Sequence, residues 1–152
     1  MRRTTRTTMT TSASLIAIAL CFLAGLQAGR AAAPDHGSLI ERDAEVARRE
    51  PGTHNGGGET TGYSFFAKAP NPALVFRKRA LHPGSAIGSH RQDVDEVYYV
   101  LSGSGELALD GEKHAVGAGT AILTRPGSTH SLKQVGSDDL VIIIAYPPAA
   151  AK

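Results

Sequence analysis

Short runs of apolar and β-branched residues, separated by glycine, proline and aspartate, fill the chain from Gly62 to Tyr146. They recur roughly every 8–12 residues, a spacing typical of all-β sandwiches and barrels. Dipeptides such as Asp110-Gly111 favour tight hairpin turns between them. The pattern predicts one all-β domain, with strands over residues 63–66, 74–81, 94–101, 105–109, 113–116, 120–123, 130–135 and 140–146.

Two of these strands differ in the pattern of their faces. Along 74–81 neither face is cleanly apolar, because basic residues fall on both, so we expect a strand at the outside or edge of a sheet. Along 140–146 the sequence Leu-Val-Ile-Ile-Ile-Ala-Tyr is apolar on both faces. We expect this strand to be covered on both sides.

The region before the strands is polar and rich in glycine. Residues 38–49 mix apolar and charged positions, and Ser38 followed by Glu41 resembles a capping box. This combination predicts a short helix that ends at Pro51-Gly52.

The next five residues, His54-Asn55-Gly56-Gly57-Gly58, predict a loop, because consecutive glycines do not favour regular structure. Whether the loop closes over the domain as a lid stays open at this point. We therefore expect a flexible polar and glycine-rich segment at 34–61 and the β-domain at 62–148.

Residues 1–33 have the pattern of a secretory signal peptide. Arginines at positions 2, 3 and 6 precede an apolar stretch over 15–26, and three alanines end at Ala33. The apolar stretch is well short of the ~20 residues that span a bilayer. Cleavage after Ala33 or after Ala31 would deliver the protein to the periplasm or the medium. N-terminal sequencing of exported protein should begin between Ala32 and Asp35, and an intact Met1 there would contradict export.

Removal of this leader changes the charge of the chain. Four of the sixteen lysines and arginines precede Pro34 and none of the fourteen acids does, so the formal net charge falls from +2 to −2. No cluster of basic residues remains to favour nucleic-acid binding. The single cysteine, Cys21, also lies in the leader, so the mature chain offers no thiolate ligand and no disulfide.

Residues that could bind a metal gather at the start of predicted strand 94–101. In an extended chain His90, Gln92, Glu96, Tyr98 and Val100 would share one face, and the opposite face is apolar as well, which predicts burial on both sides. A buried carboxylate is costly without a cation or paired hydrogen bonds. With a second imidazole further along the chain, these groups favour a divalent transition-metal site.

The spacing of these residues resembles two cupin motifs. The first is matched by Gly84-x5-His90-x-Gln92-x3-Glu96-x6-Gly103, and the second by Gly119-x5-Arg125-Pro126-Gly127-x2-His130-x3-Gln134. The resemblance covers roughly residues 73–146 and implies a single cupin-type jelly-roll β-barrel, here preceded by the signal peptide and the glycine-rich segment. It also implies metal ligands on the inner wall, at His90, Gln92, Glu96 and His130.

Gln92 departs from the family pattern, because most cupins have a second histidine there. An amide oxygen is a neutral and harder donor than imidazole, which favours Mn(II), Fe(II) or Ni(II) with open positions over a closed zinc site, with zinc kept as an alternative. A cupin that has lost its metal is a further alternative.

Three functions follow from the resemblance. The first is a metalloenzyme acting on a small oxygenated substrate, as a dioxygenase, isomerase, decarboxylase or lyase. Tyr98 is the candidate catalytic residue, with core packing as its other role. The second is a non-catalytic module that binds a sugar or small organic acid. The third is a homodimer formed through the apolar strand 140–146, with the cavity a relic.

Overall fold

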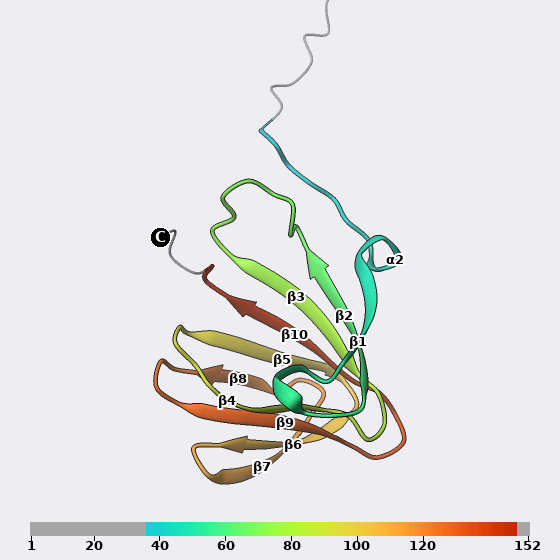
Figure 1. Ribbon diagram of the computed structural model, residues 1–152, viewed down its shortest axis with the longest axis vertical. Coiled ribbons are helices and arrows are strands. Elements are labelled where there is room, and N and C mark those ends of the chain that lie inside the picture. The colour runs from blue at the N-terminus through green and yellow to red at the C-terminus, as the bar shows by residue number, and fades with distance from the viewer. Residues whose placement is uncertain (1–35, 149–152) are drawn as a thin grey trace, which may run out of the picture. The chain divides into compact units, whose positions relative to one another are not determined.

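The computed structural model describes residues 36–148, so the predicted leader lies outside the described part of the chain. These residues form ten strands with one short α-helix and one 3₁₀ turn (Figure 1). The elements are α2 (Asp43–Val46), β1 (Ala47–Pro51), η1 (Thr53–Asn55), β2 (Glu59–Phe65), β3 (Val75–Leu81), β4 (Ala86–Arg91), β5 (Glu96–Ser102), β6 (Ser104–Leu109), β7 (Glu112–Gly117), β8 (Ala121–Thr124), β9 (Thr129–Val135) and β10 (Leu140–Tyr146). Within residues 36–148, no helix is long and apolar enough to span a membrane.

The strands form two antiparallel sheets that do not close into a barrel. The larger sheet has the order β1-β2-β3-β10-β5-β8, and the smaller has the order β4-β9-β6-β7. The all-β class is therefore confirmed, and the closed barrel is replaced by two facing sheets. A closed barrel would need hydrogen bonds between the edge strands of the two sheets. The edge strand β8 is four residues long and pairs with β5 alone.

The core lies between the inner faces of the two sheets. The larger sheet contributes fully buried residues such as Leu81, Val100 and Ile142, and the smaller contributes Ile87 and Leu132. Each strand turns alternate side chains to this core, as its period of two requires. Burial of these apolar surfaces drives the pairing of the sheets and fixes which face of each strand points inward.

The segment before residue 62 is more regular than the sequence predicts. The helix spans only Asp43–Val46, and the next residues form strand β1, paired with β2 from Ala47 opposite Tyr63 to Pro51 opposite Glu59. The predicted boundary between residues 61 and 62 falls within β2. The sequence did not predict this edge strand because its residues are mostly charged and show no apolar alternation. Surface ion pairs such as Arg49–Glu59 at 2.8 Å support its pairing with β2 instead.

The expected capping box is also displaced along the chain. The backbone N–H of Arg42 donates to the Glu45 carboxylate at 2.7 Å, so the N-cap lies at Arg42, four residues after Ser38, and the helix begins at Asp43. The Glu41 carboxylate instead accepts a hydrogen bond from the backbone of Phe66 at 2.6 Å.

Strand β3 is central in the larger sheet and not at its edge. It pairs with β2 on one side and with β10 on the other. Its inward face carries Arg79, whose guanidinium lies 2.6 Å from Glu50 and donates to the Thr60 hydroxyl at 2.8 Å. The sequence pattern misplaced the strand because this buried charge is compensated by a residue from distant β1.

The outer face of β5 is exposed, contrary to the prediction of burial on both sides. Val97, Tyr99 and Leu101 are 41–46% exposed, whereas Glu96, Tyr98 and Val100 between them are buried. Strand β10 is likewise covered fully on one face only, because its alternate outer residues are half-buried. No described element of the chain packs over this outer face, so its apolar side chains stay at the surface.

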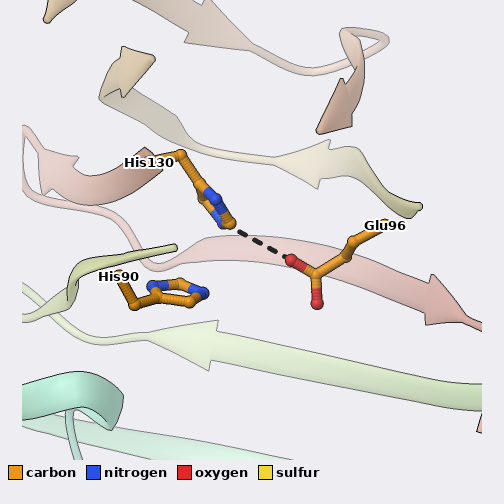
Figure 2. Close-up of side chains that lie close together, drawn as sticks. All are labelled: His90, Glu96 and His130. Atoms are coloured by element: carbon orange, nitrogen blue, oxygen red, sulfur yellow. Dashed lines mark ion pairs between the residues drawn. The ribbon is translucent and has the colours of Figure 1, made fainter. Parts of the chain in front are cut away.

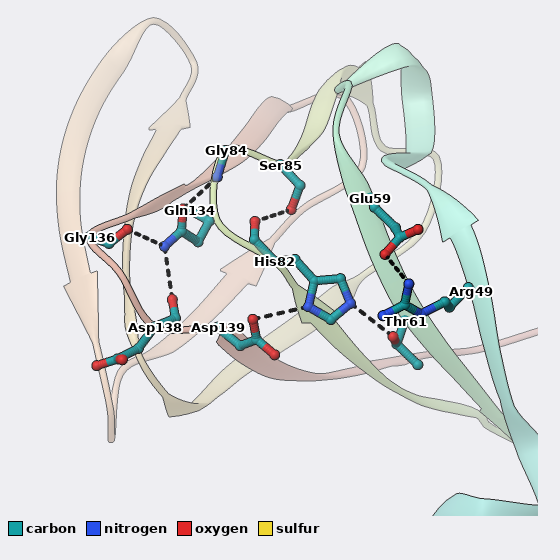
Figure 3. A network of polar contacts seen from close by, with 10 residues as sticks. All are labelled: Arg49, Glu59, Thr61, His82, Gly84, Ser85, Gln134, Gly136, Asp138 and Asp139. Atoms are coloured by element: carbon teal, nitrogen blue, oxygen red, sulfur yellow. Dashed lines mark hydrogen bonds and ion pairs between the residues drawn. The ribbon is translucent and has the colours of Figure 1, made fainter.

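A polar network connects the end of β3 with the turn between β9 and β10 (Figure 3). The Gln134 amide oxygen accepts from the backbone of Gly84 at 3.0 Å, and its nitrogen donates to the carbonyls of Gly136 and Asp138. His82, which directly follows β3, lies 3.0 Å from both Asp139 and Thr61. Both cupin-like motifs are thereby joined at one end of the sheets.

Candidate metal centre

Three of the four predicted ligands converge from three strands (Figure 2). His90 on β4 lies directly opposite His130 on β9, and Glu96 is the first residue of β5 in the other sheet. One donor atom from each lies within 4.8 Å of the others. The extended chain assumed from His90 to Val100 is interrupted, because the chain leaves β4 after Arg91 and enters the larger sheet at Glu96.

The pair formed by His130 and Glu96 is almost completely enclosed. Its Nε2 and Oε2 atoms are 3.4 Å apart, and the side chains are 0% and 8% exposed. The Nε2 atom also lies 3.1 Å from the Tyr98 hydroxyl. The other ring nitrogen, Nδ1 of His130, is buried without a hydrogen-bond partner in the described chain.

His90 is oriented by its own strand. Its Nδ1 atom lies 2.9 Å from the backbone carbonyl of Gly88, which can only accept a hydrogen bond. The proton therefore belongs on Nδ1, and Nε2 keeps a free lone pair. A backbone carbonyl in this position is the usual way in which proteins orient a metal-binding histidine.

Gln92 reaches the cluster through Glu96, because its amide nitrogen donates to Oε2 of that carboxylate. Exchanging the amide nitrogen and oxygen requires only a rotation of the side-chain amide. A role for the Gln92 oxygen as a fourth ligand therefore stays a prediction.

Tyr98 is buried beside the carboxylate. Desolvation and the neighbouring Glu96 charge raise the pKa of Tyr98 above its ordinary value. The phenol is therefore protonated at neutral pH and can donate a hydrogen bond, but it cannot serve as a base. Both roles considered for Tyr98 are compatible with this position, because the residue belongs to the core and lines the cavity.

A small cavity of about 80 Å³ opens beside the cluster and contains two residues that sequence reasoning missed. Arg77 and Arg79 project from β3 to its wall. Arg79 is neutralised by Glu50, whereas Arg77 has no ion pair in the described chain and its Nε atom is buried without a hydrogen-bond partner. The Arg77 guanidinium lies 5.7 Å from the ring centroid of Tyr146. The signal was the pair Arg77 and Arg79, which share one face of a predicted strand with the apolar Val75 and Leu81.

His54 also reaches this cavity, from η1. Its ring stacks on His90 with centroids 3.6 Å apart and planes 2° from parallel. Partial burial lowers the pKa of His54, and electrostatic repulsion from the neighbouring His90 ring lowers it further. The glycine-rich loop thus contacts the predicted site.

The donor set fits a divalent cation. Glu96 is buried, and in residues 36–148 its only ion-pair partner is a histidine. A buried carboxylate without a permanently charged partner is stabilised by a bound cation. Two ligand atoms each about 2.1 Å from one ion lie roughly 3–3.5 Å apart, which matches the distance between His130 and Glu96. The residues present could therefore hold a metal with two nitrogen donors and one carboxylate.

Comparisons with known proteins agree with this geometry. The family model for a cupin domain matches residues 78–146. An oxalate-binding protein of Thermotoga maritima is 30% identical over 106 residues, which are 67% of this chain and 88% of the relative. A crystal structure from the same organism, described as a predicted oxalate decarboxylase, has a TM-score of 0.66 and 26% identity, and the match covers 72% of this chain and 98% of that one.

A more distant match is a 5-nitrosalicylic acid 1,2-dioxygenase of Bradyrhizobium, with 27% identity over 92 residues. The match covers 60% of this chain and 42% of that enzyme. The relatives therefore include both a binding protein and an oxidative enzyme.

Proposed function

The chain belongs to the cupin family, and we propose that it holds a divalent metal at His90, Glu96 and His130 and binds a small carboxylate there with the help of Arg77. The observation that carries the proposal is the shared cavity. Two members of the candidate metal cluster, His90 and Glu96, lie on the wall of the same cavity as Arg77, which has no ion pair in the described chain. A bound metal ion would repel the positively charged Arg77 guanidinium nearby. An anionic ligand between them would be attracted by both charges.

The chemistry of the guanidinium favours a carboxylate. Arginine presents donors in a planar fork that matches two carboxylate oxygens. When bound, the cation would supply Lewis acidity for ligand oxygens at its open positions. A cavity of about 80 Å³ is far below the roughly 300–1,000 Å³ of pockets for drug-sized ligands, so it suits a ligand of a few non-hydrogen atoms. Oxalate, named for the Thermotoga relative, has this size and charge.

We infer capture rather than turnover as the better supported role. Glu96, the one carboxylate at the cavity, is engaged as a metal ligand, and Tyr98 is held protonated. The metalloenzyme hypothesis stays a prediction. Incubation of the metal-loaded protein with oxalate, with and without oxygen, separates the two: loss of oxalate with first-order dependence on protein would favour the enzyme.

The experiment that tests the proposal is a two-step titration. Metal-free protein should bind one equivalent of Mn(II) or Ni(II), and the loaded protein should then bind oxalate, whereas the metal-free protein should bind it weakly. Oxamide, the neutral diamide with as many non-hydrogen atoms as oxalate, is the matched ligand and should bind much more weakly. Absence of metal binding, or equal affinity for oxalate with and without metal, would overturn the proposal. Mn(II), Fe(II) and Ni(II) remain the preferred ions, a preference that rests on the prediction that the harder Gln92 amide oxygen joins the ligands.

The exposed apolar face of the larger sheet supports the proposed homodimer. Val97 lies between Leu123 and Ala145 in register, and Tyr99 lies beside Ile143, so the apolar side chains form one continuous surface over β5, β8 and β10. Soluble monomers seldom expose large continuous apolar surfaces, and a flat one can pair with its own copy about a two-fold axis.

Tyr99→Glu is expected to convert a dimer into a monomer in sedimentation experiments, because two buried charges would face each other across the axis. The matched control is Val135→Glu, since Val135 is 48% exposed on the other sheet. A wild-type chain that sediments as a monomer at all concentrations would contradict the dimer.

Export likewise remains a proposal that rests on the N-terminal pattern of residues 1–33.

A further inference from the structure

The segment from Gly52 to Gly58 is packed backbone to backbone against β4. The Ala86 N–H donates to the Gly57 carbonyl at 3.2 Å. A Cβ added at Gly56 would lie 2.0 Å from the Ala86 oxygen, and one at Gly88 would lie 1.9 Å from the His54 oxygen. The glycines therefore permit a close approach that no other residue allows. We call residues Gly52–Gly58 the arm. Its close packing against β4 places His54 at the wall of the cavity.

The backbone at the tip of this arm is strained where the imidazole is attached. His54 has φ 52° and Asn55 has φ 59°, both in the left-handed region. This conformation is unfavourable for a residue with a Cβ, and glycine would avoid most of the strain. In a segment otherwise rich in glycine, the chain keeps a histidine at a position that glycine would fill with less strain. Strain of this kind is characteristic of functional positions.

The His54 ring has donor atoms available for a ligand. Neither ring nitrogen has a hydrogen-bond partner among residues 36–148, and the ring lies against His90 on the wall of the cavity. His54 is not one of the three residues whose donors lie within 4.8 Å of each other. Because a bound ion lies near the plane of each imidazole, sharing one requires the ring to turn out of the parallel stack. His54 is an exposed residue, which leaves room for this turn.

We propose that His54 is a further ligand of the metal centre, and that the arm supplies the imidazole that the cupin motif loses at Gln92. The proposal rests on the proposed function, because it requires that His90, Glu96 and His130 hold a metal. It assigns a role in the site to the glycine-rich segment, and it raises the number of imidazole donors from two to three.

The test uses His54→Gly, with Asn55→Gly as the matched control. Glycine relieves the left-handed backbone in both variants, so the metal-free proteins should melt at or above the wild-type temperature. Electron spin-echo measurements on the Cu(II)-loaded proteins should count three coordinated imidazoles in wild type and in Asn55→Gly, and two in His54→Gly. Calorimetric titration with Ni(II) should show an affinity about tenfold lower in His54→Gly alone.

The outcomes separate this proposal from the one on which it rests. A wild-type protein with two coordinated imidazoles, or a His54→Gly variant with wild-type Ni(II) affinity, would overturn the role of His54 and leave the metal site intact. A wild-type protein that binds neither ion would overturn both. A loss of affinity in both glycine variants would attribute the effect to the backbone of the arm and would also reject His54 as a ligand.

Discussion

Glu96→Gln is expected to lower the affinity for Mn(II) or Ni(II) by at least about 100-fold, because loss of a ligand should exceed the roughly 10–100-fold cost of altering an outer partner. The substitution keeps the size of the side chain and removes the only anionic donor of the cluster. It should not unfold the metal-free protein, since it replaces a buried carboxylate by a neutral amide. Calorimetric titration of the metal-free protein measures the affinity, and thermal melting checks the fold.

Two variants complete this experiment. Glu106→Gln changes an exposed carboxylate on β6, which pairs with Lys113, and should bind metal as wild type does. Gln92→His should strengthen binding of late divalent metals such as Zn(II) and Cu(II), because imidazole is the stronger donor. Equal affinities in wild type and in Glu96→Gln would show that Glu96 is not a ligand.

Arg77→Gln should weaken oxalate binding while the affinity for the metal stays that of the wild type. A hydrogen bond to a charged group contributes about 1.5–3 kcal/mol, so the affinity of the metal-loaded protein for oxalate should fall about 10–100-fold. Arg77→Lys keeps the charge but not the planar fork, and it should recover only part of the loss. Titration of each metal-loaded variant with oxalate gives these affinities.

The matched control is Arg49→Gln, which removes an arginine whose partner Glu59 is at the surface. It should bind oxalate with wild-type affinity. If Arg77→Gln bound oxalate as tightly as wild type, the guanidinium would have no part in recognition. If it lost metal and oxalate together, Arg77 would support the site rather than the ligand.

Much of the fold could be read from local patterns. The eight predicted strands correspond to β2, β3 and β5 to β10, because alternating apolar residues and turn dipeptides act over a few positions. Strands β1 and β4 escaped because neither has an apolar run. The former is an edge strand of charged residues, and the latter carries Gly88 and His90 at an irregularity in its register.

The site was only partly predictable for the same reason. Motif spacing identified His90, Glu96 and His130, whose donors the structure brings together. Arg77 was expected to be a surface residue of an outer strand. The local sequence does not show whether a basic side chain points to solvent or into a cavity. His54 looked like part of a flexible loop, because the close contact of its glycines with β4 involves residues some thirty positions away.

By itself, then, the sequence determined the all-β class, most strands, the cupin resemblance and three side chains of the candidate metal site, since these depend on period, turn chemistry and motif spacing. Only the tertiary structure decided that the strands form two separate sheets and that the chain crosses between them from His90 to Glu96. It also decided that Arg77 and His54 share a cavity with His90 and Glu96. Those features depend on which distant strands pack together. That choice is made by burial summed over the whole domain, which no short segment encodes.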